Sequence, residues 1–309
     1  MRSNETRTLT YENLLSAQNN FLDNFLKELD QQPIFKRRKQ LNLRSGNKPY
    51  PHFTYRYLPL TKEKDEKSIR NYLVESRLWL SSPSSFNDPF DMMCGYTFEE
   101  TFQNKRKFLD EKFQQFYPDL PKHIKEETIS DLLASNQIVA EILNEKYQNE
   151  IAQHGVCSFS DDARDILMWA HYGSDNKGVC LQFQITRDVF IFTHATAIGY
   201  SDKFPTINYL KDNLGKEAAR AMWQKFKNWK YEKERRIIHP TGANSYLQFN
   251  PSALTALILG CKLESNSEEI IKSLLRERKQ KNYPPLKIFR ATQDNKEYKI
   301  RIKRVNDFS

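Results

Sequence analysis

The stretch GVCSFSDDARDILMWAHYGSDNKGVCLQFQI, residues 155–185, contains two predicted strands on either side of a short predicted helix. Its outer segments, GVCSFS and GVCLQFQI, are short apolar runs of the kind that forms buried strands. Between them, Asp161 or Asp162 can cap a helix and Gly173 can end it, with Trp169 packing inward. We therefore expect His171 and Tyr172 in the last turn of this helix, near the beginning of the second strand.

Short strands and helices continue to alternate on both sides of this stretch. Further strands are predicted at FTYRYLPL (53–60), ATAIGYS (195–201), ERRIIHP (234–240), LTALILG (254–260), LKIFRAT (286–292) and YKIRIKRV (298–305). Helices are predicted at 209–226 and 265–280, and residues 68–81 predict a helix that runs into another strand. The helices are spaced too irregularly for repeated β-α-β units. We expect an α+β fold with a curved or split mixed sheet and peripheral helices.

Two segments differ from this pattern. Residues 1–50 predict an N-terminal helix and then a basic linker, and residues 51–309 predict one α+β domain with a helical insertion at about 98–154. The basic residues of the linker have no acid between them, so they can contact phosphate groups or simply keep the linker solvated. They are Lys36, Arg37, Arg38, Lys39, Arg44 and Lys48.

Composition narrows the class of protein. The chain has 309 residues, a net charge of +9 and 39% hydrophobic residues, which predicts a globular protein with an affinity for anions. Its apolar runs are too short to cross a bilayer and its N-terminus lacks the apolar core of a signal peptide, so we expect a cytoplasmic protein without a membrane partner. The four cysteines are far apart, which favours reduced, buried thiols.

Several common site motifs are absent. Only 9 glycines occur, and none forms the glycine pattern of a Rossmann fold or of a P-loop. The sequence also lacks the motifs of zinc proteases, serine hydrolases and zinc deaminases, and we assign no metal ligands. Any chemistry must come from a less common site.

A loop dense in polar residues follows a predicted strand at SSPSSFNDPFD, residues 81–91. Asn87 can present its amide, and Asp88 or Asp91 can accept hydrogen bonds from a hydroxyl, a base edge or a ribose. The alternative is a turn that these side chains cap for structural reasons. We keep this loop as a candidate binding segment.

A run of charged residues occurs at WKYEKERRI, residues 229–237. If it is a strand, residues two apart share a face, so Glu232 and Glu234 become neighbours. Two carboxylates in one field suit general acid and base chemistry or the stabilisation of an oxocarbenium ion. The alternative is a solvated edge strand with surface salt bridges.

Five of these motifs together resemble an uncharacterised bacterial family, the domain of unknown function DUF2971. The resemblance covers roughly residues 54–259, without the helical insertion, and it implies a shared site but no established reaction. The motifs are YRYL (55–58), FNDPFD (86–91), SFSDD (158–162), MWAHYG with KGVCLQF (168–183) and WKYEKERR (229–236).

The chain is also similar to ADP-ribosyltransferases, including toxins that modify nucleic acid. That family has a split-sheet α+β fold and binds NAD without a Rossmann glycine loop. Carried over to this sequence, the resemblance implies Arg56 as the first-strand residue and Glu234 as the final glutamate, with Glu232 as the extra glutamate of the E-x-E variant. These three are the implied catalytic residues.

The middle position of that site has more than one candidate. It is filled either by Ser82 or Ser84, or by Tyr172 in an arrangement like His-Tyr-Glu with His171. The residues implied to bind NAD are Tyr55, Ser84, Asn87, Asp88, Trp169, His171 and Tyr172.

The same resemblance implies a mechanism in which NAD is the substrate. Glu234 would bind the ribose 2′-hydroxyl and stabilise the oxocarbenium ion, while Arg56 would hold the pyrophosphate or the adenosine ribose. Tyr172 or Trp169 would stack on the nicotinamide. Glu232 or Asp88 would orient the acceptor.

This implies an effector of the toxin or phage-defence type, which modifies a nucleic acid or a protein and has an antitoxin or another defence protein as partner. One alternative is a metal-dependent nuclease that uses Asp88, Asp91, Glu232 and Glu234, although the one E-x-K on a predicted strand, Glu297–Lys299, is far from them in sequence. Another is a nucleic-acid-binding or sensing module that uses residues 36–48 and the KIRIKR strand.

Overall fold

The computed structural model describes residues 6–12, 20–44 and 50–308, which form two compact units. The first, which we call the sheet unit, consists of Met1–Ser82, His154–Ile198 and Lys230–Ser309. The second, which we call the insert unit, consists of Pro83–Gln153 and Gly199–Trp229. None of the helices in the described part of the chain combines the length and apolar character that a membrane crossing requires.

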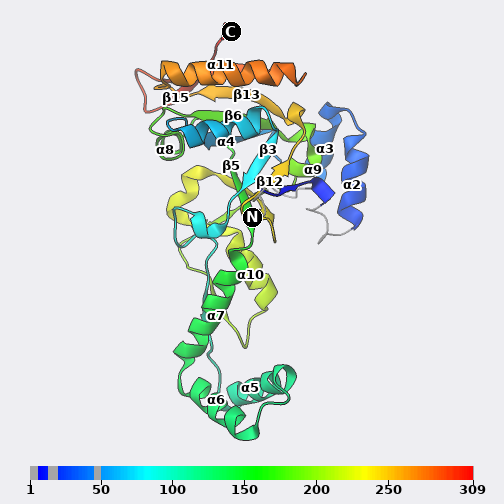
Figure 1. Ribbon diagram of the computed structural model, residues 1–309, viewed down its shortest axis with the longest axis vertical. Coiled ribbons are helices and arrows are strands. Elements are labelled where there is room, and N and C mark those ends of the chain that lie inside the picture. The colour runs from blue at the N-terminus through cyan, green and yellow to red at the C-terminus, as the bar shows by residue number, and fades with distance from the viewer. Residues whose placement is uncertain (1–5, 13–19, 45–49, 309) are drawn as a thin grey trace, which may run out of the picture. The chain divides into compact units, whose positions relative to one another are not determined.

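The sheet unit is built on a large open mixed sheet, which confirms the α+β prediction. Eight strands run in the order β15-β14-β13-β6-β2-β5-β11-β7, and β13 pairs in parallel with β14 while the other pairs are antiparallel (Figure 1). They are β2 (Phe53–Leu58), β5 (Gly155–Ser160), β6 (Val179–Gln184), β7 (Thr196–Ala197), β11 (Glu234–His239), β13 (Leu254–Leu259), β14 (Lys287–Gln293) and β15 (Ile300–Arg304). A smaller sheet joins β1 (Thr8–Leu9), β12 (Ser245–Gln248) and β3 (Arg77–Leu80).

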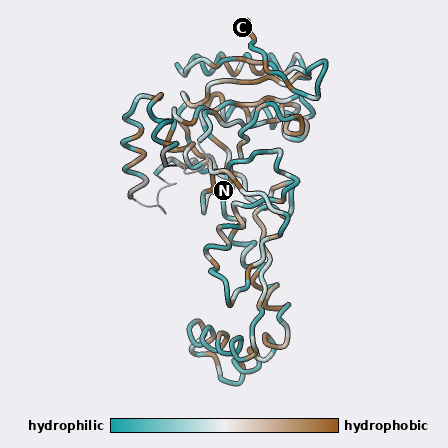
Figure 2. The backbone as a smooth tube through the Cα atoms, turned by 180° about the vertical axis from the view of Figure 1, so that it is seen from behind, coloured by the Kyte–Doolittle hydropathy of each residue, from teal (hydrophilic) through white to brown (hydrophobic). Residues whose placement is uncertain are grey.

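Helices cover both faces of the large sheet. One face packs against α4 and α11 in the main core, whereas the other packs against α8 through Trp169 and Met168. Figure 2 shows hydrophobic colour along many strand segments of this sheet, as expected for strands covered on both sides. The helices of the unit are α2 (Asn20–Asp30), α3 (Ile34–Arg44), α4 (Glu63–Leu73), α8 (Ile166–His171), α9 (Val189–Phe192) and α11 (Ser265–Gln280), with short 3₁₀ turns η2 (Ile185–Arg187) and η4 (Pro251–Ala253).

The N-terminal segment belongs to the sheet unit and is not an appended helix with a linker. Its residues Leu9, Leu26 and Leu41 are buried in the main core. The expected linker contains helix α3, which Arg37 fixes by donating to the Asp30 carboxylate at 2.6 Å and to the Thr186 backbone oxygen at 3.1 Å. Charge alone suggested a solvated linker, but apolar residues at helical spacing bring the segment into the core.

The other basic residues of the predicted linker differ in how the structure describes them. Lys36, Arg38 and Lys39 are exposed on α3. The side chain of Arg44 and the whole of Lys48 lie outside the described residues.

Strand register decides which side chains share a face of the large sheet. Tyr55 of β2 is opposite Ser160 of β5, and Ser160 is opposite Glu234 of β11, so these three side chains point to one face. Arg56 follows Tyr55 in the same strand and therefore points to the other face, where its guanidinium lies 5.8 Å from the centre of the Tyr72 ring. The face that carries Glu234 is the one that α8 covers.

A left-handed turn fixes the C-terminal end of α8. Residues 174–176 all have positive φ angles, of 45°, 54° and 70°. Gly178 then passes so close to the neighbouring strand that a Cβ atom on it would lie 2.2 Å from the backbone oxygen of Leu58. Only glycine fits at that distance, so the turn holds His171 and Tyr172 in one place.

Gly178→Ala is expected to destabilise the protein by about 3 kcal/mol or more, because the added methyl group meets backbone atoms that cannot move aside. The measurement is urea unfolding at neutral pH. Gly215→Ala is the control, since its Cβ would lie in the exposed first turn of an α-helix, 3.9 Å from the Asn213 side chain. That substitution should be neutral or stabilising by up to about 1 kcal/mol. Equal effects of the two variants would contradict the close approach at Gly178.

Asp188 provides a pH-dependent contribution to stability. Its carboxylate caps α9 by accepting from the Ile191 amide at 3.2 Å, and it accepts from the Asn250 amide at 2.7 Å. Burial raises the pKa of Asp188 to about 6, although these hydrogen bonds lower it. The folded state therefore holds the proton more tightly than the unfolded chain does.

Stability from this group is fully present below about pH 4 and is lost as the pH rises to about 6. Two pKa units correspond to about 3 kcal/mol. We therefore expect the stability of the wild type, measured relative to Asp188→Asn, to fall by about that amount between pH 4 and pH 7. Urea unfolding of both proteins at each pH checks this, and parallel pH profiles would show that Asp188 titrates normally.

The insert unit contains the predicted helices and also two chain segments that were not expected to join them. Helices α5 (Phe102–Phe116), α6 (Lys122–Ala134) and α7 (Asn136–Ile151) occupy the expected insertion. Around them, β4 (Gly95–Thr97) pairs with β9 (Thr206–Asn208), and β8 (Gly199–Ser201) pairs with β10 (Gln224–Phe226). The unit also contains η1 (Pro83–Ser85) and α10 (Leu214–Met222). Pairing between these distant segments makes the unit larger than the helices alone.

Candidate functional site

Helix α8 places His171 and Tyr172 as predicted, and Trp169 packs inward as expected, which removes it as a stacking partner for the nicotinamide. Asp165 caps the helix through the amides of Leu167 and Met168, where the sequence suggested Asp161 or Asp162. The Trp169 side chain is fully buried, donates from its indole to the Ala163 backbone oxygen at 2.9 Å and meets the Tyr57 ring edge-on at 5.1 Å. Trp169 is therefore a core residue and offers no surface for a ligand to stack on.

The WKYEKERRI segment is not a continuous strand. A 3₁₀ turn, η3 (Lys227–Glu232), comes first, and β11 begins only at Glu234. Lys233 between them has a positive φ of 45°, and its ammonium group pairs with Asp162 at 2.8 Å. The left-handed residue breaks the two-residue alternation, so Glu232 and Glu234 are not successive side chains on one pleated face.

Glu234 is held in a buried ion pair. Arg236 lies two residues further along β11 and points to the same face, donating from Nε to Oε1 at 2.7 Å and from Nη2 to Oε2 at 3.0 Å. The exposed fractions of the two side chains are 0% for Arg236 and 4% for Glu234. Both carboxylate oxygens of Glu234 therefore bind a fixed cation, which suits a structural role.

Glu232 is arranged differently. Its side chain is buried, and its Oε1 accepts a hydrogen bond from the Tyr172 hydroxyl at 2.6 Å. Its backbone oxygen accepts from the Ser160 hydroxyl, also at 2.6 Å, which fixes the turn against β5. The structure thus brings together two residues 60 positions apart, a glutamate and a tyrosine.

A second pair of residues lies beside this one on the same two elements. The Tyr231 hydroxyl lies 3.1 Å from Nδ1 of His171, and the two rings meet edge-on at 6.0 Å. His171 is exposed, while Tyr172 and Tyr231 are half-buried. Tyr231 was not among the predicted site residues, although its position next to Glu232 was a signal that could have found it.

Tyr55 shares the face of the sheet that α8 covers, whereas Arg56 does not. The Tyr55 hydroxyl accepts a hydrogen bond from Gln182 at 3.4 Å, and burial raises the pKa of this phenol. Arg56 donates to the backbone oxygen of Ser158 from the opposite face of the sheet. Arg56 and Glu234, the first and last residues of the predicted triad, therefore point to opposite faces.

Loop residues Ser84, Asn87 and Asp88 belong to the insert unit and not to the sheet unit that holds the glutamates. Ser84 and Asn87 are exposed, whereas Asp88 is buried and accepts from the Phe90 amide at 2.9 Å. Asp91 is also buried and pairs with Lys225 at 3.3 Å. The predicted site residues are thus divided between two units.

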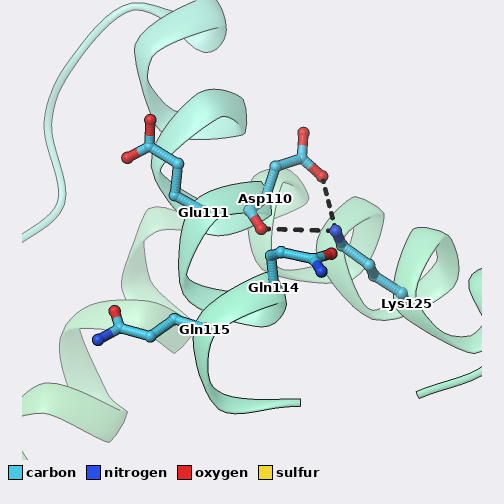
Figure 3. A pocket seen from close by; sticks show the side chains of 5 residues that line it. All are labelled: Asp110, Glu111, Gln114, Gln115 and Lys125. Atoms are coloured by element: carbon cyan, nitrogen blue, oxygen red, sulfur yellow. Dashed lines mark hydrogen bonds and ion pairs between the residues drawn. The ribbon is translucent and has the colours of Figure 1, made fainter. Parts of the chain in front are cut away.

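An open depression lies between α5 and α6 in the insert unit (Figure 3). Polar residues line it, and Lys125 fills part of it by reaching the Asp110 carboxylate at 3.6 Å and the Asp110 backbone oxygen at 3.4 Å. Because Lys125 and Asp110 satisfy one another and the depression is wide open to solvent, it encloses little of a ligand. The other residues that line it are Glu111, Gln114 and Gln115.

A grouping of three or more His, Cys, Asp or Glu side chains that could hold a metal ion does not occur among the described residues. The four acids of the nuclease alternative are divided equally between the units, with Asp91 paired to Lys225 and Glu234 to Arg236. All four cysteines are unbridged, and three of them are buried.

Comparisons of the chain with protein-family models, with curated proteins and with solved structures found no match. Function has to be inferred from the site itself. Among the described residues, the hydrogen bond from Tyr172 to Glu232, next to His171, brings two predicted residues 60 positions apart into direct contact.

Proposed function

We propose that this protein cleaves the nicotinamide–ribose bond of NAD and transfers ADP-ribose, with Glu232 as the acting carboxylate. The observation that carries the proposal is the 2.6 Å hydrogen bond from the Tyr172 hydroxyl to Glu232, formed between the end of α8 and the end of η3. Of the two triads considered from the sequence, this arrangement supports the one like His-Tyr-Glu. In this proposal Glu232 takes the catalytic role that the sequence resemblance implied for Glu234.

The chemistry requires an anion beside a developing positive charge. When the bond between the nicotinamide nitrogen and C1′ of the ribose breaks, its electron pair leaves with the nicotinamide, and positive charge develops on the ribose. A buried carboxylate stabilises that charge strongly because little water screens it. An acceptor nucleophile then forms the new bond to C1′ and loses its proton.

The residues around Glu232 suit the rest of such a substrate. The Tyr172 hydroxyl holds the carboxylate in one orientation, so less reorganisation is needed as charge develops. The edge-on rings of His171 and Tyr231 offer an aromatic surface to the nicotinamide or to a ribose. Exposed Arg164, two residues after Asp162, supplies a cation for the pyrophosphate in place of Arg56.

The biological role that fits this chemistry is an effector of the toxin or phage-defence type. Its acceptor is a nucleic acid or a protein, and its natural partner is an antitoxin or another defence protein. The net charge of +9 and the exposed cations of α3 favour a nucleic-acid acceptor. Expression of the wild type should then arrest growth, and expression of Glu232→Gln should not.

Purified protein incubated with NAD labelled on the adenylate tests the proposal. We expect nicotinamide release, and transfer of label in reactions that contain bacterial RNA, DNA or lysate protein identifies the acceptor. Release without transfer would reduce the activity to NAD hydrolysis. If no reaction releases nicotinamide, the proposal fails, and magnesium-dependent cleavage of nucleic acid or simple binding with a steep salt dependence would then identify the alternatives.

A further inference from the structure

The insert unit contains a second candidate site. Its chemistry differs from that proposed for Glu232 and does not require NAD turnover. A cavity of about 290 Å³ lies where the FNDPFD loop, the β8–β9 connection and β10 meet within this unit. Its size is near the lower end of the usual range for ligand sites, which suits one small ring system. We propose that this cavity binds a single unstacked nucleobase.

The walls of the cavity are aromatic and open to solvent. Phe90, Phe204 and Phe226 all line it, with exposed fractions of 67%, 47% and 45%. The rings of Phe90 and Phe204 meet edge-on, with centroids 6.1 Å apart. Exposed aromatic residues gathered around one cavity indicate a binding surface, and nucleobases stack on such rings whatever their sequence.

The charges at the cavity favour a neutral ring over a cationic ligand. The Lys225 ammonium already lies over the Trp229 ring, 4.9 Å from its centre, and Asp91 neutralises it at 3.3 Å. Asp202, which lines the cavity, pairs with Lys227 at 2.7 Å. A methylated ammonium group would therefore find the cation position on the tryptophan occupied and two of the nearby carboxylates paired.

Asp88 supplies the hydrogen-bond acceptor that a base needs. Asp88 is buried at the cavity wall. Within the described residues, its carboxylate accepts a hydrogen bond from the Phe90 amide at Oδ1. Oδ2 can accept from the exocyclic amino group of adenine, cytosine or guanine, a group that uracil lacks. Exposed Lys203 at the rim is placed to contact a phosphate.

Two binding measurements on the full chain distinguish the possible sources of the base. AMP, CMP, GMP and UMP are titrated by calorimetry, and fluorescein-labelled single-stranded dA12 and dT12 by anisotropy. Phe204→Ala should weaken binding about tenfold or more, since stacking on one aromatic ring contributes that much. Phe116→Ala is the matched control, because that ring is exposed in the same unit and lies away from the cavity. Asp88→Asn should reduce the preference for AMP over UMP.

Binding of the mononucleotides identifies a nucleotide site, and binding of the oligonucleotides alone identifies a site for single-stranded nucleic acid. Equal effects of Phe204→Ala and Phe116→Ala would overturn the proposal, as would binding of tetramethylammonium without binding of either nucleotide probe. Glu232→Gln should bind the probes like the wild type. A protein that binds bases without NAD turnover therefore refutes only the proposed function, and the reverse result refutes only this site.

Discussion

Glu232→Gln is expected to lower the rate of nicotinamide release from NAD by about 100- to 1,000-fold, the usual effect of removing one preorganised electrostatic group. Gln keeps an oxygen at the position where Glu232 accepts from the Tyr172 hydroxyl, so the local hydrogen bond can persist. It lacks the negative charge that stabilises the oxocarbenium ion. The loss should fall on kcat, because the charge develops only in the transition state.

Tyr172→Phe is the companion variant, because it removes only the hydroxyl that orients Glu232. We expect a smaller loss of rate, since the carboxylate stays charged but is less well fixed. Urea unfolding of both variants separates chemistry from folding. A Glu232→Gln protein that is folded and releases nicotinamide at the wild-type rate would exclude Glu232 from the reaction.

Glu234→Gln is expected to destabilise the protein by about 3–5 kcal/mol, the usual cost of removing one member of a buried ion pair. Arg236 has no exposed surface, and Glu234 binds its guanidinium through both oxygens. The neutral amide keeps one acceptor but directs N–H donors toward a guanidinium that is itself a donor. The measurement is the free energy of unfolding in urea at pH 7.

Glu264→Gln is the matched control, because Glu264 pairs with Lys177 at 2.9 Å on the surface and should contribute less than about 1 kcal/mol. The double variant Glu234→Gln with Arg236→Met should recover much of the lost stability, since it removes both buried charges. If Glu234→Gln is as stable as the wild type and the enzyme loses activity, the carboxylate acts in catalysis and the pair is not structural.

We therefore expect substitution of Glu232 to lower activity and substitution of Glu234 to lower stability. The alternation in the sequence placed both on one face, and the resemblance to ADP-ribosyltransferases implied Glu234 as the final catalytic glutamate. The structure separates them by a left-handed residue, Lys233, and pairs Glu234 with Arg236. Activity and stability measured on the same two variants decide between these assignments.

Much of the fold follows from local sequence. The strands at 155–160, 179–184 and 254–259 were predicted because short apolar runs with β-branched residues have few other stable conformations. The helix at 265–280 and the end of α8 near Gly173 followed in the same way from periodicity and capping signals. Each of these signals depends on residues that are close together in the chain, so a single sequence is sufficient to predict the element.

Two features depended on contacts between distant residues. Leu9 and Leu41 joined the core because the sheet unit offers them apolar surface, which the charge of their own segment does not reveal. The break between Glu232 and Glu234 depends on the ion pair of Lys233 with Asp162 and on Ser160, which come from another part of the chain. Local propensity carries no information about such partners.

The sequence by itself determined the α+β class, most of the strands and the presence of polar residues at the end of α8 and before β11. Only the tertiary structure decided that Arg56 and Glu234 point to opposite faces, that Arg236 neutralises Glu234 and that Tyr172 meets Glu232. The physical reason is that propensity and hydrophobic period are properties of neighbouring residues. Strand register, ion pairing and the path of a left-handed turn are fixed by residues that meet only when the chain has folded.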